Sequence, residues 1–145
     1  MSNIRCNFVA LRQAARRTTQ LYDDALAPIG LRVTQYSILS ELRRHPNATI
    51  SELAETMVMD RATLGHNLRP LERDGLIRIE VAQDRRARVI VLTDAGLAKF
   101  QDAKPLWARA QRVFENELGG DFAERLRRDL ARVSGADFAA GSSTS

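Results

Sequence analysis

The feature that most constrains the fold of this sequence is residues 49–93, where two helical patterns and two strand patterns follow without a gap. Ser51 is placed to cap the first helix, and a turn follows at Val58. Asp60 is placed to cap a second helix, which ends at Gly75. Helix, tight turn, helix and hairpin in this order predict a winged helix-turn-helix.

The second helix of this segment, residues 60–74, separates apolar from basic side chains. Leu64, Leu68 and Leu71 lie on one side at spacings of four and three, which predicts a buried stripe. In helix-turn-helix docking the N-terminal part of this helix reaches base edges in the major groove, and other contacts go to phosphates. We therefore expect base reading by Arg61, Thr63, His66 and Asn67, and phosphate anchoring by Arg69 and Arg73.

The hairpin that follows carries a basic loop. Apolar residues alternate with polar ones on both sides of the loop, which predicts two strands with one buried face formed by Ile77, Ile79, Val81, Val89 and Val91. The loop places Arg85 and Arg86 beside Asp84. A guanidinium on a thin loop can enter a narrow minor groove, where negative potential is concentrated. We expect Asp84 to hold an arginine side chain in place, because phosphates would repel a carboxylate that faced them.

Long helical patterns lie on both sides of this segment. Residues 4–29, beginning with Ile4, and residues 97–118 carry apolar or small side chains in steps of three and four, typical of a packed seam. Rod-like helices in a chain of 145 residues leave little interior for aromatic side chains, so we expect a two-fold homodimer interface. The expected fold is mainly α-helical with a small β wing. The expected domains are dimerisation helices at 1–30 and 94–134, a DNA-binding lobe at 31–93 and a disordered tail at 135–145.

Composition narrows the class of protein further. Twenty-two basic against 18 acidic residues give a net charge of +4, without a polybasic tail. No apolar run approaches the ~20 residues of a membrane span, and the single Cys6 fits a reducing cytoplasm. The two histidines, His45 and His66, belong to no closely spaced ligand set or nucleophile–base pair. We expect a cytoplasmic protein that is not an enzyme and holds no metal or cofactor.

Five short blocks of residues carry a resemblance to a known family: SELA at 51–54, DRATL at 60–64, LERDGLI at 71–77, the pair Asp84-x-Arg86, and Leu92-Thr93. Together they resemble the MarR family of bacterial transcription regulators, over nearly the full chain. The resemblance implies a homodimer, joined through its N- and C-terminal helices, on a palindromic operator in double-stranded DNA. It also implies that Arg86 enters the minor groove and that Asp84 orients it. Many members of the family are repressors that small aromatic or phenolic ligands, or oxidation, release from DNA.

An effector pocket is expected between the dimerisation helices and the winged lobe. The candidate lining residues are Phe8, Leu11, Tyr36, Phe100 and Trp107, which serve equally well as plain core.

Two alternative functions stay open. Cys6 resembles the peroxide-sensing cysteine of the organic hydroperoxide regulators, although it lies slightly too early in the first helix. A reactive thiol needs a lowered pKa and access to solvent. The second alternative is a winged-helix module for protein interaction alone, which would not need basic residues on both its second helix and its wing.

Overall fold

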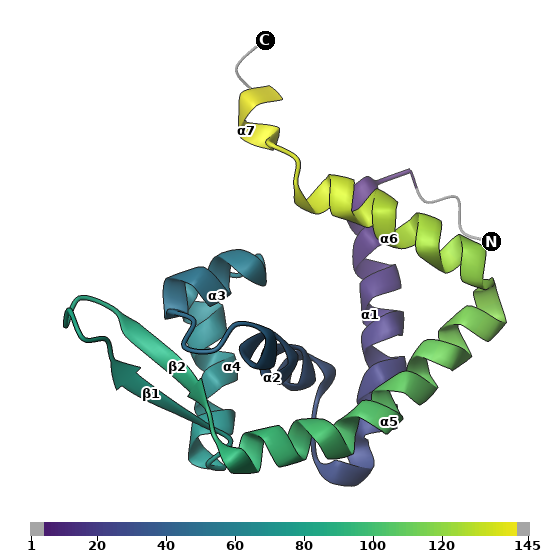
Figure 1. The fold of residues 1–145 in the computed structure, drawn as a ribbon. Helices are drawn as coiled ribbons and strands as arrows, with labels where there is room; N and C mark the ends of the chain where they lie inside the picture. Colours follow the sequence, from purple (N-terminus) through teal and green to yellow (C-terminus); the bar gives the residue numbers. More distant parts are fainter. Residues whose placement is uncertain (1–4, 142–145) are drawn as a thin grey trace. The chain divides into compact units, whose positions relative to one another are not determined.

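The structure, a computed structural model, describes residues 5–141 and is mainly α-helical with one small antiparallel sheet (Figure 1). This confirms the expected fold class. The elements in chain order are α1 (Asn7–Leu26), the 3-10 turn η1 (Ala27–Ile29), α2 (Val33–Arg44), α3 (Ile50–Thr56), α4 (Arg61–Arg73), β1 (Ile77–Val81), β2 (Arg88–Leu92), α5 (Asp94–Leu118), α6 (Gly120–Ser134) and α7 (Phe138–Gly141).

The chain divides into two compact units, Met1–Ala110 and Gln111–Ser145. The first unit contains α1, the winged lobe and most of α5. The second unit contains the end of α5 together with α6 and α7. The short helix α7 lies in the segment expected to be disordered. Ile4 and the last four residues of that tail lie outside the described residues. No helix in the described part of the chain is long and apolar enough to cross a membrane.

The core of the first unit holds α4 against its neighbours. Leu64, Leu68 and Leu71, the predicted stripe, are all buried, as are Ile38 and Leu42 of α2. Each such side chain contributes about 1.5–3 kcal/mol when fully buried. The opposite side of α4 is therefore fixed as a solvent-facing surface, and its position relative to α2 and α3 is set by packing.

The caps of the two helix-turn-helix helices differ in how well the sequence predicted them. Asp60 caps α4 as expected, because its carboxylate accepts the Thr63 N–H at 2.7 Å. The α3 cap is Thr49 rather than Ser51: the Thr49 hydroxyl accepts the Glu52 N–H at 3.0 Å, and the Glu52 carboxylate accepts the Thr49 N–H at 3.3 Å. This reciprocal capping box starts α3 earlier than predicted and frees the Ser51 side chain for another partner.

The hairpin forms as predicted, but the buried face of its second strand is different. Ile79 pairs with Ile90 and Ile77 with Leu92, so these four residues share one face. Ile90 is fully buried, whereas Val89 and Val91, which we expected inside, are partly exposed on the other face. Side chains alternate along a strand, so a pairing offset by one residue moves the whole inward set to the other face.

The start of α5 is fixed to the end of α4 by a tight junction. The Thr93 hydroxyl donates to the Gly75 carbonyl at 2.6 Å and accepts the Gly96 N–H at 3.0 Å. The Thr93 N–H also donates to the Leu76 carbonyl at 3.2 Å. Thr93 thus caps α5, as an N-cap threonine does, and at the same time ties that helix to the turn after α4.

Candidate nucleic-acid interface

The N-terminal turn of α4 presents a set of polar side chains whose positions are fixed by local hydrogen bonds. Asp60 accepts a second bond from the Thr63 hydroxyl, at 3.0 Å. These bonds to its charged form lower the pKa of the Asp60 carboxyl below its ordinary value. Asn67 donates from its side-chain amide to the Thr63 carbonyl at 2.8 Å. Thr63 and Asn67 are therefore held at defined positions on one edge of the exposed surface.

Arg61 is held at the opposite edge of α4. Its Nη2 donates to the Ser51 hydroxyl of α3, the group that the Thr49 cap leaves available. An arginine bound at one nitrogen keeps further N–H donors for a second partner. The sequence indicated Arg61 as a DNA contact but gave no sign of the Ser51 contact, which depends on how α3 and α4 pack.

The remaining candidates on α4 are exposed. His66 and Arg69 make no ion pair or hydrogen bond through their side chains within the described part of the chain. Arg73 lies close to Asp74, with 3.4 Å between Nε and Oδ1, in a pair whose side chains are both largely exposed. Such a pair contributes at most about 1 kcal/mol, so Arg73 can exchange it for a phosphate. The structure thus brings all six α4 candidates to the solvent-facing side or its edges.

The wing loop extends away from α2, α3 and α4 at the tip of the hairpin (Figure 1). The Asp84 carboxylate accepts the backbone N–H of Arg86 at 3.0 Å. Arg85 adopts a left-handed conformation, with φ +59°, and its N–H donates to the Ala82 carbonyl at 2.8 Å. Asp84 therefore shapes the loop backbone. In the described residues it makes no ion pair with Arg85 or Arg86, contrary to the expectation that it holds an arginine side chain. Both guanidinium groups are exposed and without a partner there.

The residues expected to line an effector pocket do not come together as one site. Tyr36 stacks with two aromatic rings of α5, with centroid distances of 5.3 Å to Phe100 and 5.8 Å to Trp107. Tyr36 and Phe100 are buried, and burial raises the pKa of the Tyr36 hydroxyl, an effect that nearby arginine charges oppose. Phe8 and Leu11 are exposed on α1 instead. In this structure Tyr36 and Phe100 are core residues, and the partly buried Trp107 packs against that core.

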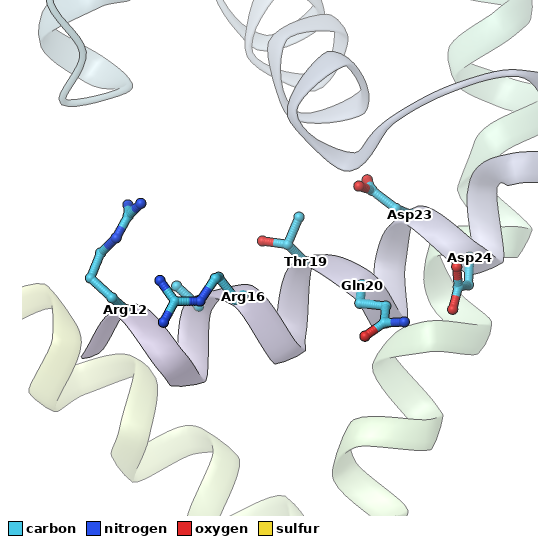
Figure 2. Close-up of a pocket in the computed structure, with 7 residues that line it drawn as sticks. Arg12, Arg16, Thr19, Gln20, Asp23 and Asp24 are labelled. Atoms are coloured by element: carbon cyan, nitrogen blue, oxygen red, sulfur yellow. The ribbon is translucent and has the colours of Figure 1, made fainter. Parts of the chain in front are cut away.

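A hollow of about 420 Å³ lies along the surface of α1 (Figure 2). Figure 2 shows Arg12, Thr19 and Asp23 pointing to the same side of the helix. None of the five expected pocket residues lines it. This hollow is not predictable from sequence, because polar side chains on an exposed helix face form no distinctive pattern. The lining residues are Arg12, Ala15, Arg16, Thr19, Gln20, Asp23 and Asp24.

Cys6 is exposed and lies immediately before α1. Access, one of the two requirements for a redox-sensing thiol, is therefore met in this chain.

Comparison with known proteins assigns this architecture to a family. Residues 31–87 match the model of the MarR family. The structure of the M. tuberculosis transcriptional regulator MosR in complex with DNA is 38% identical, with a TM-score of 0.83, over 97% of this chain and 100% of that chain. The transcriptional repressor CouR bound to p-coumaroyl-CoA is 28% identical, with a TM-score of 0.81, over 91% and 94% of the two chains. The organic hydroperoxide resistance transcriptional regulator of Bacillus subtilis is 31% identical over 59% of each chain. These relatives are transcriptional regulators rather than enzymes, and the chain described here belongs to the MarR family of transcriptional regulators.

Proposed function

We propose that this regulator is a homodimeric repressor that binds a palindromic operator in double-stranded DNA. The observation that carries the proposal is the pairing of two exposed basic surfaces in one unit, the outer side of α4 and the wing loop. An arginine-bearing helix of this kind docks in the major groove, and a thin basic loop fits the minor groove beside it. The DNA-bound structure of MosR, similar over its whole length, supports this proposal.

The residues proposed for DNA binding divide by position. Those at the start and middle of α4 read base edges, and those further along it bind phosphates. In the wing, Arg86 enters the minor groove, Arg85 contacts the backbone beside it, and Asp84 sets the loop conformation through its bond to the Arg86 N–H. The α4 residues are Arg61, Thr63, His66 and Asn67 for bases, and Arg69 and Arg73 for phosphates.

The homodimer part of the proposal rests on apolar side chains that one chain leaves exposed. Phe8 of α1 is 70% exposed, and Phe122, Leu130 and Val133 of α6 are each about 40% exposed. Exposed apolar side chains in such numbers mark an interaction surface, and closed two-fold dimers are the commonest assembly. We expect sedimentation equilibrium to give twice the chain mass of 16.2 kDa. A monomer at micromolar concentration would contradict the proposal.

Replacing Arg86 tests the DNA-binding proposal. The probe is the duplex that the wild-type protein selects from a randomised pool, and affinity is measured by fluorescence anisotropy. Arg86→Ala should lose roughly 100-fold in affinity, because each dimer has two wings and one arginine contact contributes about 1–3 kcal/mol. Arg128→Ala on α6 removes the same charge from an exposed position and should bind like wild type. Equal affinity of all three proteins would exclude Arg86 as a DNA contact, and a wild type that selects no duplex would support the alternative of a protein-interaction module.

We also propose that a small aromatic or phenolic ligand releases the repressor from DNA. The p-coumaroyl-CoA complex of the relative CouR supports this class of effector. A thermal-shift screen of aromatic acids, phenols and their thioesters identifies a binder, because a ligand stabilises the folded state according to its concentration relative to Kd. The same compound must then lower operator affinity; a binder without this effect would not be the effector.

A second candidate function is peroxide sensing through Cys6. Its exposure and the likeness to the organic hydroperoxide resistance regulator of Bacillus subtilis favour it. Operator binding is measured before and after treatment with cumene hydroperoxide, for the wild type and for Cys6→Ser. Loss of binding in the wild type alone would establish the thiol as the sensor, and equal responses would exclude it.

A further inference from the structure

Gly65 is unusual among the glycines of the DNA-binding lobe, because the backbone does not require it. It lies inside the 13-residue helix α4, two positions before Asn67. The described glycines with positive φ are Gly30, Gly75 and Gly119, each at a helix end, and Gly65 is not among them. Any L-residue therefore fits the backbone conformation at position 65.

Packing inside the protein does not require this glycine either. A Cβ atom built on Gly65 has no heavy atom of a neighbouring group within 4 Å. Gly96 shows the opposite case, since a Cβ there would lie 2.0 Å from the Leu76 carbonyl oxygen. Glycine is the least favourable residue in a helix interior after proline, and α4 already contains Pro70. The isolated chain thus gains nothing from glycine at this position.

The neighbours of Gly65 show which part of a DNA duplex its side of the helix faces. Arg61, Gly65 and Arg69 follow one another at spacings of four, on successive turns of one flank. Arg61 is bound to Ser51 of α3, which identifies this flank as the one beside α3. In helix-turn-helix docking the first helix crosses the DNA backbone. Beyond Arg61, which lies at the N-terminal end that reaches base edges, the flank beside α3 is therefore directed at sugar and phosphate rather than at the floor of the groove.

We propose that Gly65 forms a gap in the surface of α4 that receives the sugar–phosphate backbone of one DNA strand. Arg61, held at Ser51, limits the gap at one end, and Arg69 binds a phosphate at the other. A side chain at position 65 would lift the helix away from the strand and weaken every contact that depends on its depth in the groove. Gly65 is thus a positioning residue for DNA binding, an inference that rests on the proposed function.

The test is a series of side chains of increasing size at one position. Gly65→Ala and Gly65→Leu introduce good helix formers into open space, so thermal unfolding should occur at the wild-type temperature or roughly 3 °C higher. Affinity for the duplex that the wild type selects should fall by about tenfold for Ala and further for Leu. Gly120→Ala, at the start of α6 where a Cβ also meets nothing within 4 Å, should change neither affinity nor selected sequence.

Different failures have different meanings. If the wild type selects a duplex and both Gly65 variants bind it equally well, the gap is refuted while the proposed function stands. A lower unfolding temperature for Gly65→Ala would also refute the inference, because glycine would then serve the fold. If the wild type selects no duplex, the proposed function and this inference are both wrong.

Discussion

Gly96 lies in the first turn of α5, where that helix crosses the backbone between α4 and β1. An alanine Cβ at this position would lie 2.0 Å from the Leu76 carbonyl oxygen and 2.7 Å from Leu92 Cδ1. Both separations are shorter than any that carbon atoms tolerate, and one of the opposing atoms is backbone. The start of α5 must therefore move by about 1 Å or more if Gly96 is replaced by alanine.

This movement acts on bonds that join α5 to the turn after α4. The Leu76 oxygen accepts the Thr93 N–H at 3.2 Å, and the Thr93 hydroxyl donates to the Gly75 carbonyl at 2.6 Å. Weakening two such bonds costs about 2 kcal/mol, and overpacking adds about 1–3 kcal/mol. The better helix propensity of alanine returns up to about 1 kcal/mol. We expect Gly96→Ala to lower the free energy of unfolding by about 3 kcal/mol.

Urea unfolding followed by circular dichroism measures this loss. With an m-value of about 2 kcal/mol/M, the midpoint should fall by roughly 1.5 M. Gly120→Ala, where the added methyl group meets nothing within 4 Å, should unfold within a few tenths of a molar of the wild type. An unchanged midpoint for Gly96→Ala would show that α5 does not pack this closely on the Leu76 backbone. The proposed role of the Thr93 bonds in joining α5 to the turn after α4 would then be wrong.

Three further outcomes are expected. Operator affinity should fall steeply as the salt concentration rises. Arg69→Ala and Arg73→Ala should each reduce the slope of log affinity against log salt concentration by about 1 for each phosphate that is no longer neutralised. Unchanged slopes would exclude phosphate anchoring by these residues. The lowered pKa of Asp60 contributes stability at pH values above 3.8, the ordinary pKa of this carboxyl. This stability is lost as the pH falls through the lower folded-state pKa. Between pH 5 and about 2, the unfolding temperature of Asp60→Asn should therefore fall less than that of the wild type. The raised pKa of Tyr36 contributes stability that is fully present below pH 10.0 and is lost as the pH rises through the raised folded-state pKa. Tyr36→Phe should therefore lose less stability at alkaline pH than the wild type. An identical dependence of stability on pH would contradict burial as the cause of the shift.

Local chemistry made much of the DNA-binding lobe predictable from sequence. The spacing of Leu64, Leu68 and Leu71 alone identifies the buried side of α4, and Asp60 caps the helix it precedes. Gly75 ends α4 because its positive φ favours glycine. Each of these signals is complete within a few residues, so no knowledge of the tertiary structure is needed.

The features that sequence did not predict depend on residues far apart in the chain. Ile90, rather than its valine neighbours, faces inward because pairing with Ile79 sets the register. The contact between Arg61 and Ser51 depends on how α3 packs against α4. In the same way, the stacking of Tyr36 with Phe100 depends on how α2 lies against α5. The α3 cap is a local exception: Ser51 was expected, but the reciprocal bonds between Thr49 and Glu52 place the cap at Thr49.

A two-fold protein that reads DNA with α4 and the wing together should leave a characteristic footprint on its operator. A footprint on the selected duplex tests this most directly, with dimethyl sulfate probing the major groove and hydroxyl radicals the minor groove. We predict two protected major-groove segments centred about 10 base pairs apart, each with an adjacent protected minor-groove segment that Arg86→Ala leaves open. A single protected segment, or minor-groove protection that survives Arg86→Ala, would contradict the account.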